Sequence, residues 1–131
     1  MARILIVDDD EAIRTSLRKT LERAAHAVFG AMDGAAALRF LAANSVDVVI
    51  TDLYMPDVDG LELIGRLRRE GTVERIIAVT GGGQVAGQNL LTVAKVLGAD
   101  VTLAKPFTRE QLLEAVDQLM NKASGPDPKG A

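Results

Sequence analysis

Five short runs of apolar residues alternate along this chain with longer stretches in which apolar residues recur every three or four positions. This alternation is typical of β-strands connected by helices, and therefore of a parallel sheet with helices on both faces. The predicted strands are Arg3–Val7, Ala27–Ala31, Val46–Thr51, Arg75–Thr80 and Val101–Ala104. The first, third and fourth consist almost wholly of Ile, Leu and Val, as expected for strands buried on both faces. The sequence thus predicts an α/β fold with five strands and five helices.

Helical spacing and capping residues support this assignment. One apolar helical face is expected from Ile13, Leu17 and Leu21, a shorter one from Leu38 and Leu41, and a last one from Leu112, Val116, Leu119 and Met120. Asp33 can cap the second helix, and Gly71 and Gly98 can end the third and fourth. The stretch "TREQ" at positions 108–111 predicts a capping box at the start of the last helix.

Length and composition indicate one globular domain. The chain has 131 residues, enough for a single core, and we expect a domain over residues 1–122 followed by a flexible tail or linker at 123–131, "ASGPDPKGA". Cysteine is absent, which excludes disulfides and thiolate chemistry, and no segment predicts a signal peptide or membrane span. These features favour a cytoplasmic protein without membrane contact. The lone His26 is expected on the surface or in packing.

The charge gives no sign of direct nucleic-acid binding. The net charge is -3 and the pI is about 5.1, so the chain has no basic footprint. The basic run Arg66, Arg68 and Arg69 is interpreted as a solvated helix face.

Polar residues gather where the predicted strands end. Three acids, Asp8, Asp9 and Asp10, follow the first strand, Asp52 follows the third in "VVITDLYMPDVDG", Thr80 ends the fourth and Lys105 follows the fifth. Functional crevices of open α/β sheets lie at the carboxyl ends of the strands, so these side chains are expected to converge.

Closely spaced carboxylates repel one another, and a cation relieves that repulsion. A few carboxylates with a backbone carbonyl and waters suit Mg²⁺. We therefore expect Mg²⁺ at Asp9 and Asp52, with Asp8 as a direct or water-mediated ligand and the Tyr54 carbonyl as a further oxygen. An aspartate beside such an ion can act as a nucleophile and form an acyl phosphate, which makes Asp52 a candidate phosphoacceptor.

The segments "ILIVDDDEAIR", "VVITDLYMPDVDGLELI", "IIAVTG" and "LAKPF" together resemble the receiver domain of two-component response regulators over residues 3 to about 122. The resemblance implies a flavodoxin-like, doubly wound sheet of order 2-1-3-4-5. It also implies that Asp8 and Asp9 form the acidic pair, that Asp52 is phosphorylated, and that Thr80 and Lys105 are the hydroxyl and lysine of the site.

The resemblance further implies a partner. A histidine kinase or histidine phosphotransfer protein would offer phosphohistidine, and the receiver would transfer the phosphoryl group to its own aspartate and later hydrolyse it, without acting as an enzyme on other substrates. A cis Lys105–Pro106 bond is implied as well. Gly60 is expected to supply backbone angles at the turn into the third helix that other residues avoid. The downstream partner, the cognate kinase and the oligomeric state are not predicted.

Plainer readings remain for single residues. Asp8–Asp10 can simply cap the first helix, and Asp52 and Thr80 can be turn residues. The loop "TGGGQVAG" suggests a nucleotide site, but its glycines (Gly81, Gly83 and Gly87) do not match G-x-G-x-x-G, and a loop that rearranges on phosphorylation is favoured. A metal-dependent phosphatase and an unphosphorylated scaffold are the rival functions.

The chain departs from the family pattern at Thr102, where receivers usually carry an aromatic residue three positions before the lysine. Coupling from Thr80 to the surface formed by the fourth helix, the fifth strand and the fifth helix is therefore expected to use another route or to be weak. Tyr54 and Gly82, two positions after Asp52 and Thr80, flank the path of attacking water in this family. We expect Tyr54 to shield the acyl phosphate partly.

Overall fold

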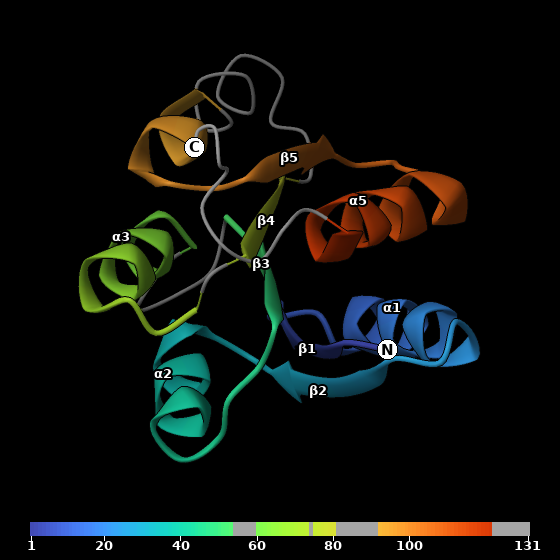
Figure 1. Cartoon of the computed structure of the whole chain (residues 1–131), viewed down its shortest axis with the longest axis horizontal. Coiled ribbons are helices and arrows are strands. Elements are labelled where there is room, and N and C mark those ends of the chain that lie inside the picture. The colour runs from blue at the N-terminus through green and yellow to red at the C-terminus, as the bar shows by residue number, and fades with distance from the viewer. Residues whose placement is uncertain (54–59, 74, 81–91, 122–131) are drawn as a thin grey trace.

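A five-stranded parallel sheet forms the centre of the molecule (Figure 1). The computed structural model describes residues 1–53, 60–73, 75–80 and 92–121. The strands are β1 (Arg3–Val7), β2 (Ala27–Ala31), β3 (Val48–Asp52), β4 (Arg75–Thr80) and β5 (Val101–Ala104). Their order is β2-β1-β3-β4-β5, and every neighbouring pair is parallel. The predicted fold class and strand order are confirmed.

The bounds of β3 correct the prediction of Val46–Thr51. The backbone N–H of Asp47 donates to the Arg3 carbonyl (2.8 Å), and its carboxylate accepts from the Arg3 N–H (2.8 Å), so Asp47 closes the start of the ladder. At the other end Asp52 still pairs with Val79, and the N–H of Leu53 donates to the Val79 carbonyl (2.9 Å). The carboxylate of Asp52 thus belongs to the last residue of a fully buried strand.

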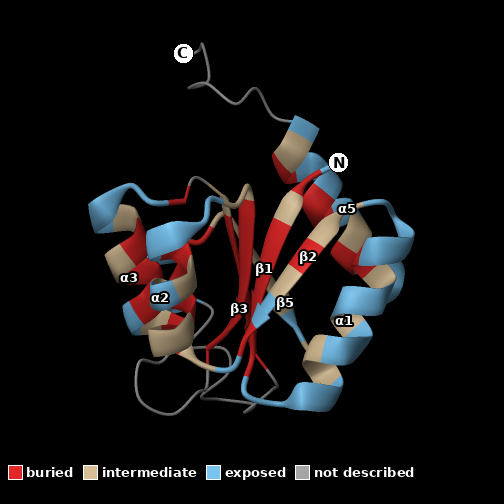
Figure 2. Ribbon diagram, turned by 90° about the horizontal axis from the view of Figure 1, so that it is seen from below, coloured by how far each residue is buried: buried red, intermediate tan, exposed pale blue. Residues whose placement is uncertain are grey.

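Helices cover both faces of the sheet. The helices are α1 (Glu11–Arg23), α2 (Gly34–Ala43), α3 (Gly60–Glu70) and α5 (Arg109–Asn121), and residues 92–97 are also helical. These account for the five predicted helices. Figure 2 shows α1 and α5 on one side of the sheet and α2 and α3 on the other. None of the helices in the described part of the chain is long and apolar enough to cross a membrane.

The predicted capping residues lie where the helices begin and end. Asp33 accepts the Ala36 N–H through its side chain at the start of α2 (2.8 Å). Gly71, after α3, and Gly98, after residues 92–97, have φ of 66° and 126°, a region that favours glycine. At α5, Thr108 and Gln111 exchange two hydrogen bonds of 2.8 and 3.0 Å, which confirms the capping box.

Alternate strand residues form two cores. The core under α2 and α3 includes Leu5, Val7, Leu41, Val49, Ile64 and Ile76. The core under α1 and α5 includes Ile4, Ile6, Leu21, Ile50, Ile77 and Val116. Because helices cover both faces of the sheet, the ends of its strands are the places where polar side chains can gather.

Arg68 corrects one interpretation. Its guanidinium donates to the Gly98 carbonyl (2.8 Å) and pairs with Asp100 (2.5 Å), so it lies partly buried between α3 and the start of β5. Arg69 is exposed, and Arg66 is partly exposed and pairs with Glu70 on the same helix (3.5 Å). The interpretation as a solvated helix face therefore holds for Arg66 and Arg69 and is wrong for Arg68.

Candidate functional site

The polar residues singled out by the sequence lie at one edge of the sheet. Asp8 follows β1, Asp52 ends β3, Thr80 ends β4 and Lys105 follows β5. These four strands are consecutive neighbours in the sheet, so their carboxyl ends lie side by side. The expected convergence is found for the residues that the structure describes.

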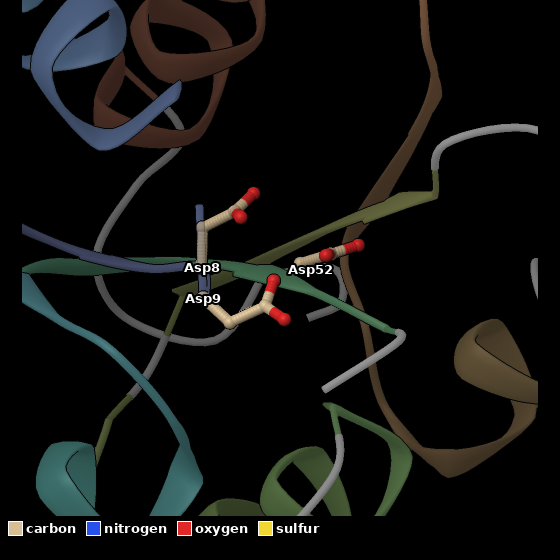
Figure 3. Close-up of side chains that lie close together, drawn as sticks. All are labelled: Asp8, Asp9 and Asp52. Atoms are coloured by element: carbon tan, nitrogen blue, oxygen red, sulfur yellow. The ribbon is translucent and has the colours of Figure 1, made fainter. Parts of the chain in front are cut away.

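Three carboxylates form the centre of this edge (Figure 3). Asp8, Asp9 and Asp52 each offer an oxygen, and these oxygens lie within 4.8 Å of one another. Asp8 and Asp52 are only 3% and 8% exposed, whereas Asp9 is open to solvent. Burying two ionised carboxylates side by side is costly without a neutralising group. The donor set, made of oxygens with one open side, fits a hard divalent cation such as Mg²⁺.

Asp8 is held by its neighbours at both carboxylate oxygens. Its Oδ1 accepts the N–H of Asp10 (2.9 Å), and its Oδ2 lies 3.3 Å from the ammonium of Lys105. Lys105 thereby places a positive charge beside Asp8 in the acidic cluster. The geometry brings together three carboxylates that could hold a metal ion and the ammonium of Lys105.

Helix capping explains only one of the three consecutive acids. Asp10 is the N-cap of α1, and its Oδ1 accepts the N–H groups of Ala12 (2.8 Å) and Ile13 (3.2 Å). Asp8 and Asp9 instead face Asp52. The plain capping interpretation therefore holds for Asp10 alone.

Thr80 adds a buried hydroxyl. It is 1% exposed, and its Oγ1 has no hydrogen-bond partner among the residues that the structure describes. Its carbonyl accepts the Lys105 N–H (2.8 Å), which fixes the end of β5 against β4. The Lys105–Pro106 bond is cis, as predicted.

Gly60 supports Asp52 in a way that differs from the prediction. Its φ is not in the left-handed region; the positive-φ glycines of the described chain are Gly71 and Gly98. Instead a Cβ at Gly60 would lie 2.1 Å from the Asp52 carbonyl oxygen and 2.6 Å from the Leu53 Cα. The first turn of α3 thus packs directly on the backbone of the candidate phosphoacceptor, and glycine is needed for space.

Thr102 lies in β5 opposite Ala78, two strand positions before the pair Thr80 and Ala104. It is partly buried within the strand. Tyr54, Gly82, the glycine loop with Gly81, Gly83 and Gly87, and the predicted tail lie outside the described residues.

Two further residues have defined contacts. His26, away from the site, accepts the Ala2 N–H at Nδ1 (3.0 Å), in agreement with a packing role. Arg14 of α1 donates from a guanidinium nitrogen to the Asp8 carbonyl (2.6 Å), a contact that the sequence analysis did not assign. No local pattern in the sequence marks this contact, because it depends on how α1 packs beside β2.

Comparisons with known proteins agree with this geometry. The sequence profile described as "Response regulator receiver domain" matches residues 4–117. Response regulator MprA of Mycobacterium sp. (strain KMS) is 40% identical over 128 residues, which are 95% of this chain and 54% of that protein. MprA of Mycobacterium ulcerans is 36% identical over 129 residues, again 54% of its length. The chain thus spans about half the length of these relatives.

Solved structures show the same fold. A response regulator receiver domain protein from Clostridium thermocellum has a TM-score of 0.83 and 30% identity, covering 93% of this chain and 96% of that one. The Vibrio cholerae chemotaxis protein CheY4 has a TM-score of 0.80 and 31% identity, covering 91% and 98%. With the profile match over most of its length, the chain belongs to the response regulator receiver domain family of two-component signalling.

Proposed function

We propose that Asp52 accepts a phosphoryl group from the phosphohistidine of a histidine kinase or histidine phosphotransfer protein. The observation that carries the proposal is the grouping of three carboxylates, Lys105 and the buried Thr80 hydroxyl at one sheet edge. The transfer breaks the N–P bond of the donor and forms an O–P bond to an Asp52 carboxylate oxygen. The donor imidazole leaves with the electron pair of the broken bond.

Each neighbouring residue has a part in this proposal. Asp8, Asp9, Asp52 and the backbone carbonyl of Tyr54 would hold Mg²⁺, which when bound neutralises charge on the phosphoryl oxygens. Lys105 would neutralise a further oxygen, and the Thr80 hydroxyl would donate a hydrogen bond to the phosphoryl group. Asp8 and Lys105 already face each other at 3.3 Å, so the lysine lies close to the acidic cluster before any phosphate arrives.

The phosphoryl group would act as a switch. It adds a charge of about -1.5 to -2, enough to attract the Thr80 hydroxyl and the Lys105 ammonium and to favour one arrangement of the loops around the site. We propose that this changes contacts with a downstream protein in the cytoplasm, without direct nucleic-acid binding by this chain. Beyond its own phosphorylation and dephosphorylation the chain would catalyse nothing.

Binding of beryllofluoride, a phosphoryl mimic, tests the proposal. We expect backbone amides at the ends of β1, β3, β4 and β5 to shift in NMR spectra when Mg²⁺ and beryllofluoride are added together. Asp52→Asn should lose this response. Asp10→Asn is the matched control, because asparagine caps a helix as well as aspartate does and Asp10 only caps α1. An equal response in Asp52→Asn would contradict the assignment of Asp52.

Thr102 favours a second candidate, a receiver that binds partners without being phosphorylated. The usual aromatic residue is absent at this position, so one known route of switching is missing. Failure of the parent chain to bind Mg²⁺ or beryllofluoride would favour this scaffold. Turnover of a free phosphate ester would instead favour a phosphatase.

Tyr54 is proposed to slow hydrolysis of phosphorylated Asp52 by shielding it from water. We expect Tyr54→Ala to dephosphorylate faster than the parent, and Tyr54→Phe to stay close to it because the ring is retained. The measurement is the decay of the phosphorylated protein after removal of the phosphodonor. An unchanged decay rate in Tyr54→Ala would refute this role.

A further inference from the structure

We infer that Arg14 is a positioning residue for the metal site: it fixes the peptide group between Asp8 and Asp9, and thereby the direction of the Asp9 side chain. The inference rests on the proposed Mg²⁺ site and assigns to it a residue beyond its ligands. Arg14 lies one turn inside α1, and its guanidinium reaches back to the end of β1.

The path of the Arg14 side chain is well defined. Its Cδ lies 3.6 Å from the position that a Cβ would take at Gly30, so the stem runs over β2 beside this glycine. The guanidinium then donates to the Asp8 carbonyl at 2.6 Å. The Arg14 N–H donates to the Asp10 carbonyl (3.0 Å), so the base of the side chain belongs to the turn that Asp10 caps. Arg14 therefore connects three elements at the loop that carries the acids.

The hydrogen bond from Arg14 completes the fixation of Asp8. The Asp8 N–H donates to the Ala31 carbonyl (3.1 Å), and its two carboxylate oxygens face Asp10 and Lys105. Its carbonyl is the remaining polar group, and Arg14 holds it. Because a peptide group is planar, fixing this carbonyl fixes the plane from which Asp9 departs. Asp9 is exposed, so burial does not orient it.

The charge of Arg14 and its hydrogen bond to the Asp8 carbonyl lead to opposite predictions for the Mg²⁺ affinity of a variant that lacks Arg14. The positive charge of Arg14, close to the acidic cluster, repels Mg²⁺. By charge alone, removing Arg14 would therefore tighten Mg²⁺ binding. If its role is positional, removal would let the Asp8–Asp9 peptide turn and would weaken binding. Partners that orient metal ligands typically contribute about tenfold or more to metal affinity.

The test compares Arg14→Met with Arg18→Met by calorimetric Mg²⁺ titration of the full chain. Methionine keeps the apolar stem and removes the donor. Arg18 is the matched control because it lies one turn further along α1, carries the same charge and pairs with the exposed Glu22 (3.1 Å). We expect the Kd of Arg14→Met to rise about tenfold and that of Arg18→Met to stay at or below the parent value.

A Kd for Arg14→Met equal to or below that of Arg18→Met would overturn the inference while leaving the metal site intact. Absence of Mg²⁺ binding by the parent would overturn the proposed function and this inference with it. Arg14→Lys guards against loss of folding, since it keeps the charge and most of the stem but ends short of the carbonyl. For Arg14→Lys, a Kd for Mg²⁺ about threefold or more above the parent value supports the inference. A Kd equal to the parent value refutes it.

Discussion

At the scale of single residues, Asp52 depends on a neighbour that carries no side chain. Gly60 packs on the Asp52 carbonyl so closely that a Cβ would overlap it at 2.1 Å. This contact joins α3 to the end of β3 and fixes the backbone from which the Asp52 carboxylate projects. Sequence reasoning correctly located Gly60 at the start of α3, but ascribed it to backbone angles, because a contact between segments leaves no local pattern.

We predict that Gly60→Ala lowers the free energy of unfolding by about 2 kcal/mol or more, since backbone atoms must move to admit the methyl group. Gly65→Ala in the same helix is the control. Among the described residues, a Cβ there would meet only the end of the flexible Arg69 side chain at 3.2 Å. The higher helix propensity of alanine should therefore leave the free energy of unfolding unchanged or raise it by up to about 1 kcal/mol. Urea unfolding measures both, and equal stability of the two variants would refute the steric account.

His26 should make stability depend on pH. Burial, with help from the charge of the N-terminus, lowers the pKa of His26 below its ordinary value of 6.5, against a weaker opposite effect of Asp117. The unfolded chain then binds a proton more readily than the folded one. The contribution of His26 to the free energy of unfolding is therefore constant above about pH 6.5. It falls as the pH drops below that value and levels off once His26 is protonated in the folded form as well.

The comparison for His26 is His26→Asn, measured by urea unfolding between about pH 5 and 8. Asparagine can accept the hydrogen bond from the Ala2 N–H but does not titrate. We expect the parent to lose stability relative to the variant as the pH falls. Parallel curves for the two proteins would show that His26 does not contribute.

At the scale of elements, Arg68 joins segments that are distant in the chain. From α3 it binds the carbonyls of Gly98 (2.8 Å) and Val73 (3.4 Å) and the carboxylate of Asp100. Asp100 in turn accepts the N–H of Ile76 at the start of β4 (2.8 Å). The cluster lies at the edge of the sheet opposite the acidic site and fixes the end of the helical residues 92–97.

Arg68→Met should therefore lower the free energy of unfolding by about 1–2 kcal/mol. The effect is smaller than the full loss of its hydrogen bonds because the Arg68–Asp100 pair is partly exposed to solvent. Arg66→Met, on the same helix, removes only an exposed pair with Glu70 and should cost less than about 0.5 kcal/mol. Denaturant unfolding separates the two. An equal, small effect would mean that Arg68 behaves as a solvated residue after all.

The elements themselves were largely predictable. Strands, helices and caps follow from local spacing, and Asp33, Gly71 and the capping box at Thr108 act where the sequence places them. The start of β3 was predicted two residues early. Asp47 closes the first end of the strand ladder through hydrogen bonds to Arg3, and no local sequence pattern reveals these bonds. Arg68 was misread for the same reason, since its partner Asp100 is 32 positions away.

At the scale of the whole molecule, the order of the strands brings the site together. Asp8, Asp52, Thr80 and Lys105 are far apart in the chain, yet four neighbouring parallel strands carry them to one edge. The sequence predicted this edge because parallel strands share their carboxyl ends. It could not reveal that Arg14 supports the peptide between Asp8 and Asp9, which depends on how α1 packs beside β2.

We propose that Asp52, at this edge of the sheet, becomes phosphorylated in the presence of Mg²⁺. The most direct test is the intact mass of the chain after incubation with acetyl phosphate, with Mg²⁺ or with the metal chelated, for the parent and for Asp52→Asn. We predict one phosphoryl adduct on the parent that requires Mg²⁺ and is absent from Asp52→Asn. No adduct on the parent, or an adduct that persists in Asp52→Asn, would contradict the account.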